Sequence, residues 1–178
     1  SSDLRGVGLG VSLITLALGF LAWAGFDPGE GGMQWVERHS WIPGLGVEYV
    51  VGVDGLGLAM VALTVLLVPM ALLVSWTLTE RVPLYFGLVL WLEAGLIGTF
   101  TALNFFHWFL FWELCLIPAF FLIRLWGGPD RGSAATQFFV YTMAGSVALL
   151  LAFLALFLAT GTFDFGRARR QEIGRAHV

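Results

Sequence analysis

The sequence contains no lysine and a single cysteine, Cys115, and only 12% of its 178 residues are charged. One cysteine excludes a disulfide bond within the chain. Soluble domains carry roughly 25% charged residues, so the composition excludes an ordinary soluble domain. A formal net charge of −3 without a basic stripe argues against a nucleic-acid partner. The lipid bilayer is the one partner that the composition requires.

Long apolar runs make up most of the chain, and 58% of its residues are hydrophobic. A helix needs about 20 apolar residues to cross a bilayer. We therefore predict an all-α integral membrane protein with about five transmembrane helices and a multi-pass location in the membrane. The first run could instead be a signal peptide, but its apolar core is longer than the usual ~7–15 residues. The predicted helices cover residues 6–26, 55–78, 83–103, 105–126 and 133–160.

The polar connection of residues 27–53 separates the first two predicted helices and is rich in acidic residues. We expect antiparallel neighbouring helices and no sheet, although this connection has room for a short helix or a hairpin. Orientation follows from the arginines, because basic residues favour the cytoplasmic side. One end of the predicted helices, which we expect to be cytoplasmic, carries Arg5, Arg81, Arg124 and Arg131, while Arg167, Arg169 and Arg170 fall at the other end.

A single carboxylate, Glu113, lies in the middle of the apolar run of residues 105–128. A charged carboxylate at that depth costs roughly 2.5–3.5 kcal/mol, so such residues usually mark an ion or proton path. Pro118 lacks the N–H that would bond to the carbonyl of Leu114, which leaves that carbonyl free for water or a side chain. These features favour a proton relay at Glu113 over a structural acid bonded to a neighbouring helix.

Two further polar residues lie in the apolar runs. Glu93 is flanked by Gly95 and Gly98, which would allow another backbone to approach closely. It is either a second relay acid or a packing acid, and the sequence does not favour one of them. His107 is six residues from Glu113, so the two point to different faces of a helix. We interpret His107 as an interfacial side chain rather than a proton shuttle.

Neither His107 nor Glu113 has a neighbour at metal-ligand spacing, so we predict no metal and no haem. Arg124 is separated from Glu113 by eleven residues, about 16 Å along a helix, and is expected to reach the membrane surface instead. Three polar residues of the last predicted helix are expected to form contacts between helices. They are Tyr141, Thr142 and Ser146.

Two stretches, residues 41–76 and 111–146, carry specific motifs. The second contains Trp-Glu-x-x-x-x-Pro, then Leu-Ile-x-x-Trp-Gly-Gly, then Phe-Phe-x-Tyr-Thr-x-x-Gly-Ser. With these motifs the sequence resembles the antiporter-type membrane subunits of respiratory complex I, the NADH-quinone oxidoreductase subunit M (chain 4) group. The resemblance extends from about residue 6 to residue 160.

This resemblance implies that residues 1–171 are part of a proton-translocating subunit of roughly fourteen helices. Glu113 would lie in its fifth helix, on the proton path, with a paired lysine two helices later and so beyond residue 178. Quinone reduction elsewhere in the complex would drive proton transfer through Glu113. The chain would then be a subunit of a translocase in an energy-transducing membrane, with other membrane subunits as partners and no redox chemistry or cofactor of its own.

Gln137 departs from the family pattern, because members commonly carry lysine before the Phe-Phe pair. An amide cannot carry a proton as charge, so its contribution to the path would be a hydrogen bond. Two alternatives remain, a subunit of a multisubunit cation/proton antiporter and a non-transporting scaffold subunit. The string Leu-Ile-Arg-Leu-Trp-Gly-Gly favours the complex I subunit over the first.

The last seven residues, 172–178, end in Ile-Gly-Arg-Ala-His-Val. This string is one reading frame of a common short-read sequencing adapter. We therefore expect residues 172–178 to be partly or wholly a non-native tail, which the genomic locus would reveal.

Overall fold

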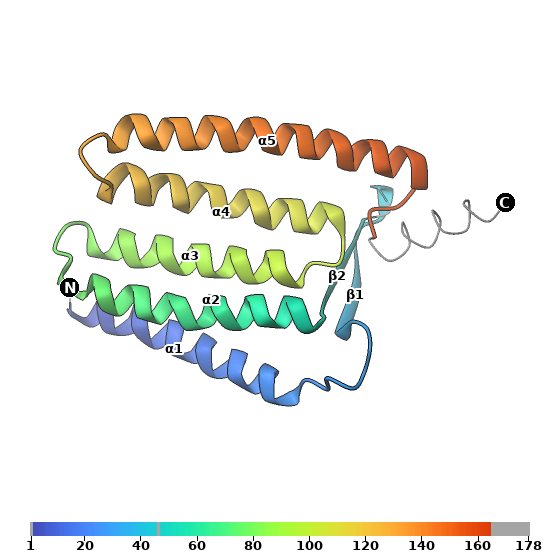
Figure 1. The fold of residues 1–178 in the computed structure, drawn as a ribbon, viewed down its shortest axis with the longest axis horizontal. Coiled ribbons are helices and arrows are strands. Elements are labelled where there is room, and N and C mark those ends of the chain that lie inside the picture. The colour runs from blue at the N-terminus through green and yellow to red at the C-terminus, as the bar shows by residue number, and fades with distance from the viewer. Residues whose placement is uncertain (1, 46, 165–178) are drawn as a thin grey trace.

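The computed structural model describes residues 2–45 and 47–164. Five helices lie side by side across its length (Figure 1). Each is long and apolar enough to span a membrane. The predicted helices are confirmed, with ends that differ by at most four residues. They are α1 (Ser2–Gly25), α2 (Gly55–Val74), α3 (Val82–Thr101), α4 (Phe105–Trp126) and α5 (Arg131–Thr160).

Two helices begin sharply because a side chain caps them. Asp54 Oδ1 accepts a hydrogen bond from Gly57 N at 2.7 Å and starts α2. Asn104 Oδ1 accepts one from Phe106 N at 2.8 Å and starts α4. A capping oxygen satisfies a backbone donor that the first helical turn leaves unpaired. Both caps stand at the ends of long apolar runs, which is why these helices start where the sequence predicts.

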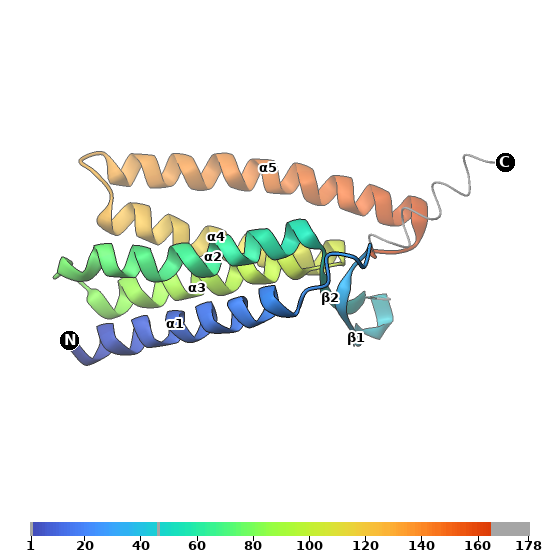
Figure 2. The same ribbon diagram turned by 60° about the horizontal axis from the view of Figure 1, so that its bottom comes forward.

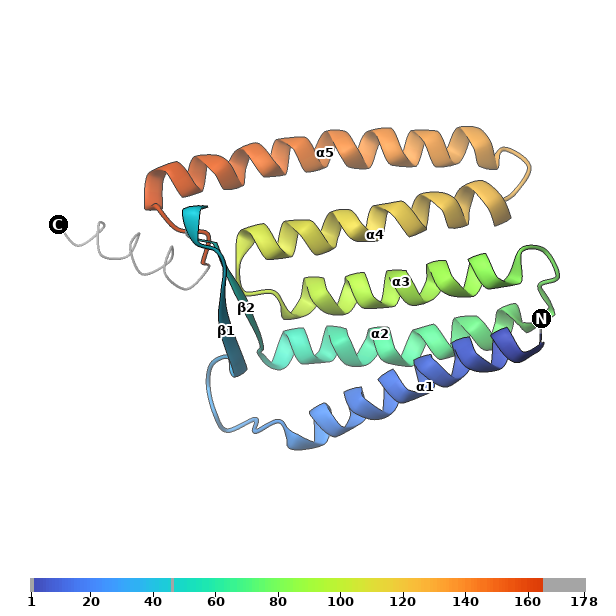
Figure 3. The same cartoon turned by 180° about the vertical axis from the view of Figure 1, so that it is seen from behind.

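Four arginines lie at one end of the bundle. Arg5 lies in the first turns of α1, Arg81 precedes α3, and Arg131 opens α5. Figures 1 and 3 show these three helix starts at the same end as the end of α4, which carries Arg124. We call it the arginine end and the opposite one the hairpin end. The prediction that these four arginines share one end is confirmed, and the cytoplasmic orientation stays a prediction. Residues 167–178, including the expected non-native tail, lie outside the described residues.

The connection between α1 and α2 forms a two-stranded antiparallel sheet, β1 (Gln34–Ile42) and β2 (Val47–Val53), joined through the short helix η1 (Pro43–Leu45). The expectation of no sheet is therefore wrong, and the hairpin that this connection had room for is confirmed. The hairpin crosses one end of the bundle (Figure 2). Lipid-exposed backbone must satisfy its hydrogen bonds within its own segment. That rule does not apply at the end of the bundle, where strand pairing can occur.

The hairpin end is closed by backbone pairing between distant segments. Leu103 N, in the α3–α4 connection, donates to Val50 O of β2 at 2.9 Å. Phe105 N donates to Phe163 O, beyond α5, at 2.8 Å. The α3–α4 connection is thus held between the hairpin and the segment that follows α5.

An ion pair strengthens the same closure. Arg38 Nη1 of β1 lies 2.7 Å from Asp164 Oδ2 and 3.2 Å from Glu48 Oε2. The hydrogen bond to Asp164 raises the pKa of Arg38 above its usual value. Arg38 remains 44% exposed, so the pair contributes on the order of 1 kcal/mol or less.

Helices that follow one another in the sequence pack together, and α1 also touches α3. On the α2–α3 interface, the apolar cluster consists of Val68, Leu72, Val82, Phe86 and Val89. α3 and α4 approach closely at Gly95 and Gly98, as the sequence predicts. A Cβ on Gly95 would lie 2.6 Å from Cys115 Sγ, and one on Gly98 would overlap the ring of Phe111. α5 packs chiefly on α4, at the edge of the bundle (Figures 1 and 2).

Candidate functional site: a partly buried glutamate on α4

Glu113 lies well inside α4, eight residues from Phe105 and thirteen from Trp126. At 1.5 Å per residue these separations are about 12 Å and 20 Å along the helix, so the carboxyl group is far from both ends. Its Oε1 atom is buried and has no hydrogen-bond partner in the described part of the chain. Buried polar groups are normally paired, and each exception requires an explanation. The position predicted for Glu113, deep in an apolar helix, is confirmed.

Aromatic contacts fix the direction in which Glu113 points. Phe109, four residues earlier, and Phe120, seven residues later, share its stripe on α4 because residues at these spacings lie on one helix face. The ring of Phe109 lies 6.4 Å from that of Phe153, and the ring of Phe120 lies 5.5 Å from that of Phe139. Both partners belong to α5. Glu113 is therefore on the side of α4 that faces α5.

Pro118 lies inside α4 and is fully buried. The helix continues past it to Trp126. Proline has no N–H, so the carbonyl of Leu114, the residue after Glu113, lacks its usual helical donor. This gives the middle of α4 a second polar group without a partner from the helix itself.

Glu93 is almost fully buried, with 3% of its surface exposed, and its Oε1 atom also has no hydrogen-bond partner among the described residues. It continues the face of α3 formed by Val82, Phe86 and Val89, which packs against α2. α4 packs at Gly95, on the opposite side of α3. The structure therefore does not bring Glu93 and Glu113 together.

His107 is 1% exposed, so the interpretation of His107 as an interfacial side chain is wrong. The hairpin covers it. The imidazole centroid lies 4.6 Å from the ring of Tyr49, 6.5 Å from that of Trp41 and 4.8 Å from that of Phe111. Neither ring nitrogen has a hydrogen bond of standard geometry within the described segments, and the backbone of Val50 is the polar group that lies toward the ring.

Gln137 and Arg124 are both exposed and lie apart from Glu113. Gln137 follows buried Ala135 by two residues, which places it on the side of α5 that faces away from α4. Arg124 lies in the last turn of α4, with its guanidinium 5.7 Å from the ring centroid of Phe120. Arg124 therefore lies apart from Glu113, as the sequence predicts, and its place near the membrane surface stays a prediction.

Ser146 is the residue whose role the sequence did not reveal. The sequence predicts that Ser146 forms contacts between helices, but its buried Oγ atom has no hydrogen-bond partner among the described residues. Its spacing in the sequence indicates the helix face that it occupies, because Phe139 and Phe153 lie seven residues before and after it on the same face. Residues 2–45 and 47–164 contain no group of three or more His, Cys, Asp or Glu side chains that could hold a metal ion.

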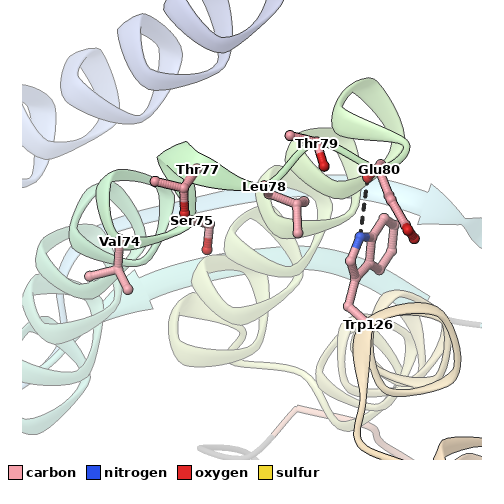
Figure 4. A pocket seen from close by; sticks show the side chains of 7 residues that line it. All are labelled: Val74, Ser75, Thr77, Leu78, Thr79, Glu80 and Trp126. Atoms are coloured by element: carbon pink, nitrogen blue, oxygen red, sulfur yellow. Dashed lines mark hydrogen bonds between the residues drawn. The ribbon is translucent and has the colours of Figure 1, made fainter.

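A separate cleft of about 500 Å³ opens at the arginine end. Its lining comes from the end of α2, the α2–α3 connection and Trp126 (Figure 4). Trp126 Nε1 donates to the backbone oxygen of Glu80 at 3.2 Å, and Tyr85 and Ser75 share a hydrogen bond of 2.7 Å nearby. Trp126 is about 20 Å along α4 from Glu113, so the cleft is not part of the carboxyl site.

Residues 102–175 match the family described as NADH:quinone oxidoreductase/Mrp antiporter, TM. The F(420)H(2) dehydrogenase subunit M of Methanosarcina mazei is 41% identical over 153 residues, which are 85% of this chain and 31% of that protein. NADH-quinone oxidoreductase subunit M of Rhodobacter capsulatus is 42% identical over 158 residues, which are 89% of this chain and 30% of that protein.

Among solved structures, respiratory complex I from Thermus thermophilus with bound NADH contains a similar chain. The match has a TM-score of 0.81 and 28% identity, and covers 92% of this chain and 34% of that one. The chain spans about a third of the length of these relatives. With five helices long and apolar enough to span a membrane and a family match over residues 102–175, the chain is similar to the antiporter-like membrane subunits of NADH:quinone oxidoreductases and Mrp antiporters.

Proposed function

We propose that this chain is part of a proton-translocating membrane subunit of a quinone-reducing complex of the complex I type, and that Glu113 binds and releases the proton. The observation that carries the proposal is the buried, unpaired oxygen of Glu113 on α4, within the residues that match this family. Ionisable residues inside membranes are costly, and they commonly mark ion or proton paths.

The surroundings of Glu113 suit a group that gains and loses one proton. The Phe109 and Phe120 contacts with α5 lie on either side of it along the helix, so apolar rings occupy the levels above and below. A proton would therefore reach and leave the carboxyl group at its own level, between α4 and α5. Nearby charge changes the proton affinity of a buried carboxyl group. Charge redistribution after quinone reduction elsewhere in the complex would thus load and unload Glu113.

The other partners and the redox chemistry follow from the same proposal. Other membrane subunits would surround this one, and the electron donor and quinone would bind to them rather than to this chain. The family description also names Mrp antiporters, which keeps a cation/proton antiporter as the alternative. Relatives that are about 40% identical are named as dehydrogenase and oxidoreductase subunits, which favours the redox-driven complex.

The test replaces Glu113 in the complete subunit within its complex. Glu113→Gln keeps the shape of the side chain and removes the titratable group, whereas Glu113→Asp keeps the carboxyl group and shortens its reach. We expect Glu113→Gln to abolish most pumping by this subunit and to lower coupled quinone reduction, and Glu113→Asp to retain part of both. Glu80→Gln, in the connection at the arginine end, is the matched control and should pump normally.

The measurement is protons pumped per electron donor oxidised, with assembled complex quantified in parallel. A purely structural acid gives the opposite order, because Gln can still bond its neighbours while a shortened buried charge is poorly paired. Normal pumping in Glu113→Gln, or losses that only follow loss of assembly, would remove Glu113 from the mechanism. Pumping that required sodium rather than quinone reduction would favour the antiporter.

A further inference from the structure

The hydroxyl group of Ser146 is unlike the other buried hydroxyl groups in the described part of the chain. Three of these donate to carbonyls of their own helix: Ser12 to Leu9 at 2.9 Å, Thr64 to Met60 at 2.9 Å and Thr99 to Gly95 at 2.9 Å. Ser146 is 3% exposed, and its Oγ atom has no partner. Since α5 packs chiefly on α4, it is α4 that covers this hydroxyl group.

Two aromatic pairs set the level of Ser146 against α4. Phe139 and Phe153 lie seven residues before and after it, and their rings contact Phe120 and Phe109 of α4. Ser146 is therefore midway between the two contacts. On α4 the midpoint lies between residues 114 and 115, which is within about 2 Å, along the helix axis, of Glu113.

Glu113 shares the α4 stripe of Phe109 and Phe120, and Ser146 shares the α5 stripe of Phe139 and Phe153. The two side chains thus enter the same interface at nearly the same level. Each carries a buried polar atom without a partner, Glu113 Oε1 and Ser146 Oγ. A buried water molecule makes two to four hydrogen bonds to polar groups that otherwise lack a partner, so one water can satisfy both atoms. The carbonyl of Leu114, which Pro118 leaves without a donor, is a third polar group on this part of α4.

We propose that Ser146 is a positioning residue for Glu113, and that its hydroxyl group holds the carboxyl group through one shared water molecule between α4 and α5. The effect on pumping rests on the proposed function of Glu113. The contact between Ser146, the water molecule and Glu113 does not depend on that function. Loss of the hydroxyl group would leave the carboxyl group without this hydrogen bond and free to adopt other rotamers, which would slow proton transfer without removing the proton carrier.

The experiment uses the complete subunit in its complex and compares Ser146→Ala, Ser146→Thr and Ser12→Ala. The control removes an equally buried serine whose hydroxyl group is already bonded to its own helix. Infrared difference spectra report the C=O stretch of the protonated carboxyl group, and the band is assigned by its loss in Glu113→Gln. Pumping per assembled complex is measured on the same samples.

We expect Ser146→Ala to move the Glu113 band to higher wavenumber and to lower pumping several-fold. Ser146→Thr keeps the hydroxyl group, so its Glu113 band should stay at the wavenumber of the unmodified protein. Ser12→Ala should change neither the wavenumber of the band nor pumping per assembled complex. If Ser146→Ala does not assemble, Ser146→Cys replaces it, since a thiol keeps the volume and weakens the hydrogen bond. An unmoved band in the assembled variant would overturn the inference. A moved band together with normal pumping in Glu113→Gln would instead support the contact and refute the proposed function.

Discussion

Gly98→Ala tests whether the close approach of α3 and α4 holds this part of the bundle together. A Cβ at residue 98 would overlap the ring of Phe111, whereas a Cβ at Gly87 on the same helix meets nothing within 4 Å. Overpacking of this kind costs about 1–3 kcal/mol. Alanine in place of glycine also gains up to about 1 kcal/mol in helix propensity, and this gain is common to both positions. We therefore expect Gly98→Ala to be less stable than Gly87→Ala by about 1–3 kcal/mol.

The assay is the free energy of unfolding of the complete subunit in detergent micelles, measured for both alanine variants. A double-mutant cycle identifies the cause, because Phe111→Leu removes the ring that the new methyl group meets and should recover most of the loss. Equal stability of Gly98→Ala and Gly87→Ala would refute the packing argument. A loss in Gly98→Ala that Phe111→Leu does not relieve would also refute it.

Two further predictions concern Glu93 and the ion pair between Arg38 and Asp164. Glu93→Gln should leave pumping near normal, because Glu93 faces α2 and not Glu113. Glu93→Leu should be at least as stable as the unmodified protein, since it removes a buried polar atom that has no partner in the described part of the chain. Loss of pumping per assembled complex in Glu93→Gln would make Glu93 a second relay acid. Asp164→Asn should lower the free energy of unfolding by about 1 kcal/mol or less, and the loss should be smaller in an Arg38→Gln background. An undiminished loss in that background would show that the ion pair is not its cause.

The five helices are predictable because apolar length alone decides what can span a bilayer. The hairpin is not predictable in the same way. β1 is exposed over most of its length, including Trp35 and Trp41, so its burial does not alternate as that of a half-buried strand would. Its pairing with β2 depends on contacts at the end of the helix bundle, and these are long-range features that a local pattern does not contain.

The candidate site shows the same division between local and long-range information. The depth of Glu113 follows from its place in an apolar run, but its direction depends on which rings of α5 meet Phe109 and Phe120. The burial of His107 depends on a hairpin about 60 residues earlier in the chain, so its position near a helix end suggested the opposite. Gln137 directly precedes the Phe-Phe pair of a family motif, but its side chain faces away from α4. Only the packing of α5 on α4 reveals this direction.

The pairing at the hairpin end imposes an order on events during synthesis. Val50 and Leu103 leave the ribosome before α4 does, so their hydrogen bond can form while the chain is still growing. The bond between Phe105 and Phe163 has to wait until α5 has been translated. A nascent chain arrested within α5 would therefore already protect the amide of Leu103 from hydrogen exchange and leave that of Phe105 unprotected by Phe163. The start of α4 is thus fully paired only after α5 has been made.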